Sequence, residues 1–320
     1  MFTLPAVSSE VLRGVSLALM SMMIYGACMV LVSAGVRGLG SGPGSMVAAA
    51  AGLPAGLVLA LVQLAGGVTV ETPGAWALCS FALAGICSTY LGRWLVFKSI
   101  ELIGPSSASG LQSTSPLITA VFGWVFLGEL IGPIGFAGIS LGIAGLVAMS
   151  VGISRSQSRA AAERVASQRG FVSAFVLIGV ASAMAYSASH VFRAFAVRQW
   201  NEPLLGAAVG SAAGLLVLIL ASGKRLPGYL REVRANPIGA RVYVAVGVMQ
   251  FVAQAMVIAS MKYIPASVAA LLSMSTPLIV MPLGRFALRS RERLSGVTVL
   301  GICITLVGIA LVVLYGGGRV

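Results

Sequence analysis

Residues 97–129 read FKSIELIGPSSASGLQSTSPLITAVFGWVFLGE, and residues 258–292 read IASMKYIPASVAALLSMSTPLIVMPLGRFALRSRE. The two stretches align on Ser115-Pro116-Leu117-Ile118 and Thr276-Pro277-Leu278-Ile279, at an offset of 161 residues. Within two residues, the same offset relates further pairs: Tyr25 and Tyr186, Gly138 and Gly301, and Glu129 and Glu292. An offset that holds over most of a chain indicates an internal duplication of about half the protein.

Composition places the duplicated unit in a membrane. Of the 320 residues, 58% are hydrophobic and 9% are charged, and the mean hydropathy is +1.00. A helix that crosses a hydrocarbon layer needs about 20 mostly apolar residues. The sequence contains ten such segments, near residues 12–35, 45–65, 75–98, 105–127, 132–151, 171–195, 204–222, 238–261, 265–287 and 295–315. They lack the alternation of barrel strands, so we expect an all-α integral membrane protein with ten transmembrane helices.

Five helices per copy is an odd number, so the second copy must cross the membrane in the opposite sense to the first. We therefore expect two inverted five-helix repeats, residues 1–153 and 171–320, joined by a basic linker at residues 154–170. Inverted repeats are typical of transporters that expose a midplane site to each side of the membrane in turn.

The distribution of basic residues predicts the orientation. Fifteen of the 21 Lys and Arg residues fall in the loops after the odd-numbered segments, five fall on the opposite side, and Arg93 lies within the third segment. Positive loops stay in the cytoplasm, so both termini are expected outside it. A bacterial-type cytoplasmic (inner) membrane is the expected location of this multi-pass chain.

Several kinds of chemistry are poorly supported by the residues present. All eight acidic residues are Glu, His190 is the only histidine, and the four Cys lie in apolar segments without metal-ligand spacing. We therefore expect no catalytic residues, no cofactor and no metal site. The net charge of +13 is explained by membrane orientation, because the basic residues lie in short loops without interleaved aromatic residues. No nucleic-acid partner is expected.

The repeated motifs resemble the EamA type of the drug/metabolite transporter superfamily. The resemblance covers nearly the whole chain and lies in three motifs. The first is Ser260-Met261-Lys262-Tyr263, which comes before a small-residue turn. The second is the proline motif, Thr114-Ser115-Pro116 and Ser275-Thr276-Pro277, and the third is the glutamate at the helix end, Gly128-Glu129 and Glu292. It implies a ten-helix transporter of small molecules and says little about the substrate. Members of this family commonly look cytoplasmic at both termini, opposite to the orientation expected from Lys and Arg.

Two prolines and one arginine are the first candidates for a role in transport. Pro116 and Pro277 each fall about a dozen residues into a segment, where proline removes a backbone hydrogen bond and bends the helix, as in gating; a packing kink is the alternative. Arg93 lies deep in the third segment and is expensive there, so it should face a cavity or a partner. Snorkelling to the headgroups is its alternative. Its repeat mate is Gln254, also polar.

Further polar residues are expected to line the pathway. Tyr186, His190 and Arg193 share one face of the sixth segment, and Tyr25 is the mate of Tyr186. Uncharged candidates come from the fourth, eighth and ninth segments: Gln112, Ser115, Gln250 and Thr276. Bonds between helices are the alternative use of these groups, and His190 could equally be a packing residue. Glu129 and Glu292 are expected to cap the helices that follow them.

Two small-residue rows complete the pattern. Gly44, Ala48 and Gly52, a row that continues to Gly56, match Gly206, Gly210 and Gly214 in the seventh segment at an offset of 162 residues. Such faces allow close helix packing within the bundle, or formation of a homodimer.

Taken together, the sequence predicts a secondary transporter that moves a small organic metabolite, an amino acid or similar, anionic or zwitterionic, by alternating access. Export is favoured by the family resemblance alone. The expected partners are this substrate and membrane lipid. A flippase for a lipid-linked sugar or headgroup is the alternative within transport, and a membrane scaffold or an intramembrane enzyme is less favoured, since the chain shows no nucleophile–base pair.

Overall fold

The protein is described by a computed structural model over residues 8–35, 38–67, 70–112, 114–129, 132–148, 169–276, 278–280, 283 and 296–315. Within these residues the structure is helical and contains no strand. Five spans are long and apolar enough to cross a membrane, and shorter apolar helices, including one at Pro133–Ala148, accompany them. The protein is therefore a multi-pass integral membrane protein, whereas the count of ten crossings stays a prediction.

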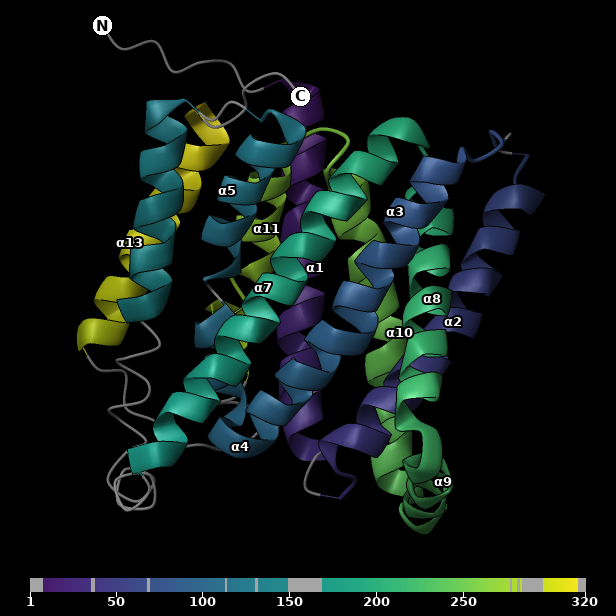
Figure 1. The fold of residues 1–320 in the computed structure, drawn as a ribbon. Coiled ribbons are helices and arrows are strands. Elements are labelled where there is room, and N and C mark those ends of the chain that lie inside the picture. The colour runs from purple at the N-terminus through teal and green to yellow at the C-terminus, as the bar shows by residue number, and fades with distance from the viewer. Residues whose placement is uncertain are drawn as a thin grey trace, which may run out of the picture.

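The helices of the first half are α1 (Ser9–Gly35), α2 (Ser41–Ala65), α3 (Ala75–Gly85), the π-helix η1 (Ile86–Gly92), α4 (Arg93–Gln112) and α5 (Ser115–Leu127). Those of the second half are α7 (Arg169–Gln199), α8 (Pro203–Ser222), η2 (Gly223–Arg225), α9 (Leu226–Ala235), α10 (Pro237–Ser260), α11 (Ala266–Met274) and α13 (Gly296–Tyr315). Figure 1 shows them as a bundle in which α13 and the helix at Pro133–Ala148 lie side by side at one edge.

The two halves interlock rather than forming separate bodies. The most extensive helix contacts join one half to the other: α1 and α2 pack on α10, α3 packs on α7 and α8, and α5 packs on α7 and α11. Both halves therefore contribute to the interior of one bundle (Figure 1).

The predicted small-residue faces bring backbones into direct contact. A Cβ placed on Gly85 of α3 would lie 1.8 Å from the carbonyl oxygen of Gly210 in α8, and one on Gly247 of α10 would lie 2.1 Å from that of Ala48 in α2. These contacts are equivalent, since 162 residues separate both Gly85 from Gly247 and Ala48 from Gly210. The faces are thus used for packing within the chain. The possible homodimer stays a prediction.

The helix boundaries differ from expectation around the prolines. The expected break at Gly104-Pro105 is absent, because α4 is helical from Arg93 to Gln112, although its apolar span ends at Leu102. The chain instead leaves the helix after Gln112 and resumes as α5 at Ser115, with Pro116 in the first turn. Proline has no N–H and clashes with the carbonyl four residues before it, which here belongs to Gln112. Pro116 therefore starts a helix instead of kinking one.

The second copy has a corresponding interruption. The segment expected to be one helix at 265–287 ends as α11 at Met274, and Ser275 and Thr276 lie outside the helix. Pro277 falls outside the described residues.

One helix was not expected. The basic interval after α8 forms the amphipathic helix α9, whose Leu226 and Tyr229 pack against the cluster of Met46, Ala49 and Leu218. Its basic side chains remain exposed.

Candidate substrate site

A cavity lies in the interior of the bundle among α1, α4, α7, α10 and α11. Its polar wall is formed by Tyr25, Gln112, Tyr186 and Gln250, and apolar side chains form the remainder. The cavity is narrow, with a volume of only about 20 Å³. A cavity of that size holds about one water, so a metabolite would enter only after the walls move apart.

The broken helices of both repeats end at this cavity. Gln112 is the last residue of α4 and Met274 is the last residue of α11, and both line the cavity. Where a helix ends, its last carbonyl groups lack intrahelical partners. Discontinuous helices at the midplane supply such groups to the substrate sites of many transporters. The helix ends before the two matched proline motifs therefore meet at one cavity, although Pro116 itself does not line it.

Two buried arginines lie next to the cavity wall. Arg93, the first residue of α4, is 6% exposed; its side chain makes no hydrogen bond or ion pair within the described part of the chain, and its Nη1 is buried without a partner there. Arg193 of α7 is 2% exposed, and its Nη2 donates to Ser88 Oγ at 2.6 Å. Both guanidinium groups are electrostatic neighbours of Tyr25 and Tyr186.

Neither arginine lines the cavity in this conformation, whereas the two tyrosines that neighbour them do. No carboxylate is among the electrostatic neighbours of Arg93 or Arg193 within the described residues. A cation buried in a membrane without a partner is costly, and such residues mark substrate or ion pathways. The arrangement fits an anionic group that reaches the arginines when the tyrosines move.

The π-helix η1 explains how Arg193 is held. Ser88, in η1, donates its hydroxyl to the Ala84 carbonyl at 2.9 Å, which leaves its oxygen free to accept from Arg193. Single π-helical turns are frequent at functional sites because they rotate the side chains that follow. Gly92 ends η1, and a Cβ there would lie 2.8 Å from the Tyr186 ring. Gly92 therefore lets Tyr186 lie against the start of α4.

Sequence reasoning placed Arg193 on the polar face of the sixth segment with Tyr186 and His190, but it also counted Arg193 among the basic residues at one side of the membrane. The structure buries Arg193 inside α7. Ser88 was missed altogether, because a serine inside an apolar run carries no distinctive pattern.

The other predicted pathway residues are buried near the cavity without lining it. Ser115 Oγ lies 2.9 Å from Ser187 Oγ, and the Thr276 hydroxyl lies 3.8 Å from Met29 Sδ. These contacts fix the points where the helices break. His190 is 1% exposed, neighbours Arg193, and has no hydrogen-bond partner for either ring nitrogen among the described residues. Gln254 is buried on α10.

A charged contact joins α5, α7 and α11. It lies at the end of the bundle that holds the C-terminal ends of α5 and α7. Glu129 Oε1 accepts from Arg198 Nη2 at 2.7 Å and from the backbone N–H of Ala266 at 2.9 Å. Glu129 therefore caps α11 of the other repeat rather than the helix that follows it, and we call this group the Glu129 clasp. Gly128, with φ of 65°, makes the sharp turn that directs Glu129 inward. Glu292 lies outside the described residues.

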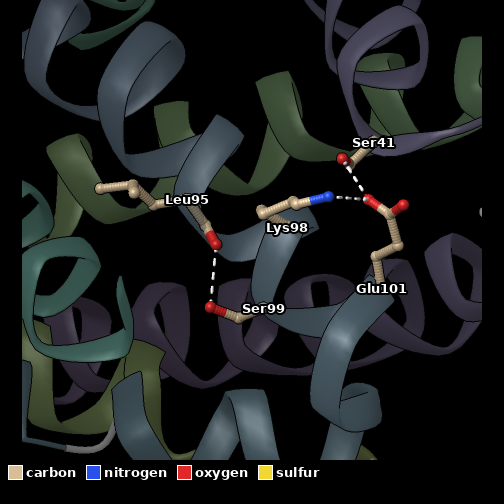
Figure 2. A network of polar contacts seen from close by, with 5 residues as sticks. All are labelled: Ser41, Leu95, Lys98, Ser99 and Glu101. Carbon is tan, nitrogen blue, oxygen red and sulfur yellow. Dashed lines mark hydrogen bonds and ion pairs between the residues drawn. The ribbon is translucent and has the colours of Figure 1, made fainter. Parts of the chain in front are cut away.

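A second polar contact ties helices together near the start of α2. Figure 2 shows the side chains of Ser41 and Lys98 directed at the same carboxylate oxygen of Glu101. The distances to Glu101 Oε2 are 2.5 Å from Ser41 Oγ and 3.2 Å from Lys98 Nζ. The beginning of α2 is thereby held against α4.

Comparison with known proteins agrees with this architecture. The sequence pattern of the EamA-like transporter family matches twice, at residues 12–151 and 173–314. The chain belongs to the EamA-like transporter family. Among solved structures, one described only as "Crystal structure of protein" is similar, with a TM-score of 0.64 and 19% sequence identity. The alignment covers 96% of this chain and 98% of the chain in that structure. That identity shows a shared fold alone. No curated protein sequence matches the chain.

Membership in the EamA-like family makes the protein a membrane transporter of small molecules. The interior cavity, at which the broken helices end, is the candidate substrate site in the described chain.

Proposed function

We propose that this EamA-like protein is a secondary transporter of a small organic metabolite that carries a carboxylate or phosphate group. It works by alternating access across ten helices in the cytoplasmic membrane of a bacterial-type cell, with export as the direction. The observation that carries the substrate class is the pair of buried arginines beside the cavity, neither of which has a carboxylate neighbour in the described residues. An arginine fork binds the planar oxygens of such groups in a bidentate manner.

The proposed cycle begins with the occluded cavity. As the tyrosines at positions 25 and 186 move aside, the substrate anion takes the place of their rings next to Arg93 and Arg193. Gln112 and Gln250 remain as neutral hydrogen-bonding groups on the same wall, and the Oε1 of Gln250 is buried without a partner in the described part of the chain. Amide groups of this kind suit the ammonium or hydroxyl groups of an amino-acid-like metabolite.

The experiment compares metabolites in the medium and cytoplasm of cells that make wild-type protein, the Arg93→Gln variant or no protein. Arg231→Gln is the matched control, because Arg231 is exposed on α9 and its loss changes net charge equally. We expect wild type and control to move an anionic or zwitterionic metabolite, and Arg93→Gln to slow that movement by roughly tenfold or more, since charge-assisted bonds are the strong ones.

Equal movement by Arg93→Gln and wild type, at equal membrane abundance, would remove Arg93 from the site while leaving transport in place. If no soluble metabolite moves, the same cells are tested with headgroup-labelled lipids. Movement of lipid alone would then replace the metabolite proposal with a flippase.

A further inference from the structure

A second recess lies between α2, η1, α4, α8 and α9, and it shares no lining residue with the central cavity. Its volume is about 210 Å³, so it has room for a ligand group. The side chains that matter are Ser45, Tyr90, Trp94, Ser222, Arg225 and Tyr229. The short helix η2 also contributes to the wall, through Arg225.

Three hydrogen-bond donors in this wall have no partner within the described chain. The guanidinium of Arg225 is exposed and forms no ion pair, and the hydroxyls of Tyr90 and Tyr229 form no hydrogen bond with described residues. The serine hydroxyls are occupied, since Ser45 donates to the Gly42 carbonyl and Ser222 donates to the Leu218 carbonyl. One cation and two phenol hydroxyls around a polar recess match the oxygens of a phosphate.

The position of Tyr229 is fixed by the fold. Its ring packs with Leu226 against a cluster that includes Met46 and Leu218. A Cβ on Gly42 would lie 2.8 Å from the Tyr229 hydroxyl oxygen, so a glycine at the start of α2 makes room for the phenol. The recess is therefore a built feature of the junction between α2 and α9.

The surroundings are those of a membrane interface. Further exposed basic residues of η2 and α9 flank the recess: Lys224, Arg231 and Arg234. Amphipathic helices with a basic face at the membrane surface attract anionic lipids. Exposed apolar side chains on the adjoining helices, Leu91, Trp94 and Leu220, offer a surface for acyl chains.

The basic surface has no counterpart in the other repeat. The corresponding interval of the first half, residues 66–74, contains Glu71 and no Lys or Arg. Because the repeats are inverted, the equivalent position would face the opposite leaflet. The charge pattern thus selects one leaflet, which is expected of a lipid ligand more than of a soluble anion that is present on both sides.

We propose that this recess binds the phosphate headgroup of an anionic phospholipid from the leaflet on the side where the Lys and Arg residues are concentrated. Arg225 pairs with the phosphate, Tyr90 and Tyr229 donate hydrogen bonds to it, and the acyl chains lie along the exposed apolar side chains of η1, α4 and α8. The site is independent of the transported substrate, because none of its residues belongs to the central cavity.

The test uses the purified full chain, stripped of lipid in detergent and titrated with dioleoyl phosphatidylglycerol or dioleoyl phosphatidylcholine under native mass spectrometry. Variants are Arg225→Gln, the pair Tyr90→Phe with Tyr229→Phe, and the control Arg231→Gln. We expect Arg225→Gln to weaken the first phosphatidylglycerol binding event about tenfold, with Arg231→Gln within about twofold of wild type. Thermal unfolding confirms that each variant is folded.

Three results would overturn the proposal: equal affinity for the two lipids, equal weakening by Arg225→Gln and Arg231→Gln, or displacement of the lipid by glycerol phosphate at equal concentration. The second result would assign the binding to general surface charge. The third would assign the recess to a soluble phosphate ligand.

Discussion

The Glu129 clasp gives the sharpest test of alternating access, because a single isosteric change removes its charge. Glu129→Gln keeps the shape of the side chain but converts the ion pair with Arg198 to a neutral contact. In the folded protein the Glu129 side chain is 5% exposed and the Arg198 side chain is 31% exposed, so the pair is only partly screened by water. The same oxygen also accepts the N–H of Ala266.

The size of the effect follows from these contacts. A hydrogen bond to a charged group contributes about 1.5–3 kcal/mol, and a neutral one about half of that. With allowance for the exposed part of Arg198, loss of the charge should cost the clasped conformation roughly 2 kcal/mol. Since 1.4 kcal/mol corresponds to tenfold, the ratio of unclasped to clasped protein should rise roughly 30-fold.

Labelling of a buried cysteine measures this ratio. In a background where the four native cysteines are replaced, Ser267→Cys places a thiol directly after Ala266, at a position that is fully buried. An impermeant maleimide should label it slowly in the parent protein, and at least about tenfold faster after Glu129→Gln. Arg198→Gln should give a similar rate, and the double variant should add little, because both changes break the same contact.

The matched control is Glu202→Gln. Glu202 is also buried and accepts one hydrogen bond, from Gln63 at 2.8 Å, but it forms no ion pair with a described residue. If Glu129→Gln labels no faster than this control while both proteins remain folded, the clasp does not hold this end of the bundle closed.

Two further changes test the packing and the orientation. Gly85→Ala should sharply lower the yield of folded protein, because its Cβ would collide with the Gly210 backbone. The control Gly228→Ala lies in open space on α9 and should be neutral in thermal unfolding. Equal yields of the two variants would contradict the close packing. A cysteine at Glu232 should react with impermeant maleimide only after cell disruption, and one at Thr72 should react in intact cells; the reverse pattern would place the basic side outside.

The duplication and the polar residues that line the cavity could be identified from the sequence, because each depends on the residue type at individual positions. Tyr25 and Tyr186 stand out as matched polar residues in apolar helices, and both lie on the cavity wall together with Gln112 and Gln250. Packing between the halves depends on which helices meet in space. The partner of Glu129 illustrates this, since Ala266 lies 137 residues away and local capping rules point to the next helix instead.

The helix breaks were placed wrongly for a related reason. A Gly-Pro pair is the stronger local stop signal, and it was preferred at Gly104-Pro105 over the isolated Pro116. The structure interrupts the helix before Pro116 because the serine and threonine beside it find partners there, as Ser115 does with Ser187. The freed backbone groups need such partners or a polar cavity in a membrane. That requirement depends on the tertiary structure, so the sequence alone could not decide between the two sites.

The interlocked packing also indicates which helices can move. Backbone contacts at Gly85 and Gly247 hold α3 against α8 and α10 against α2, and a sliding motion at either contact would bring a carbonyl oxygen into collision. We therefore expect these four helices to move as fixed pairs. By contrast, α5 and α11 are short, begin or end at a break beside the cavity, and are joined to α7 through the polar clasp. Opening of that end should thus consist of α5 and α11 tilting away from α7, so the moving parts would be the broken helices of both repeats rather than one repeat against the other.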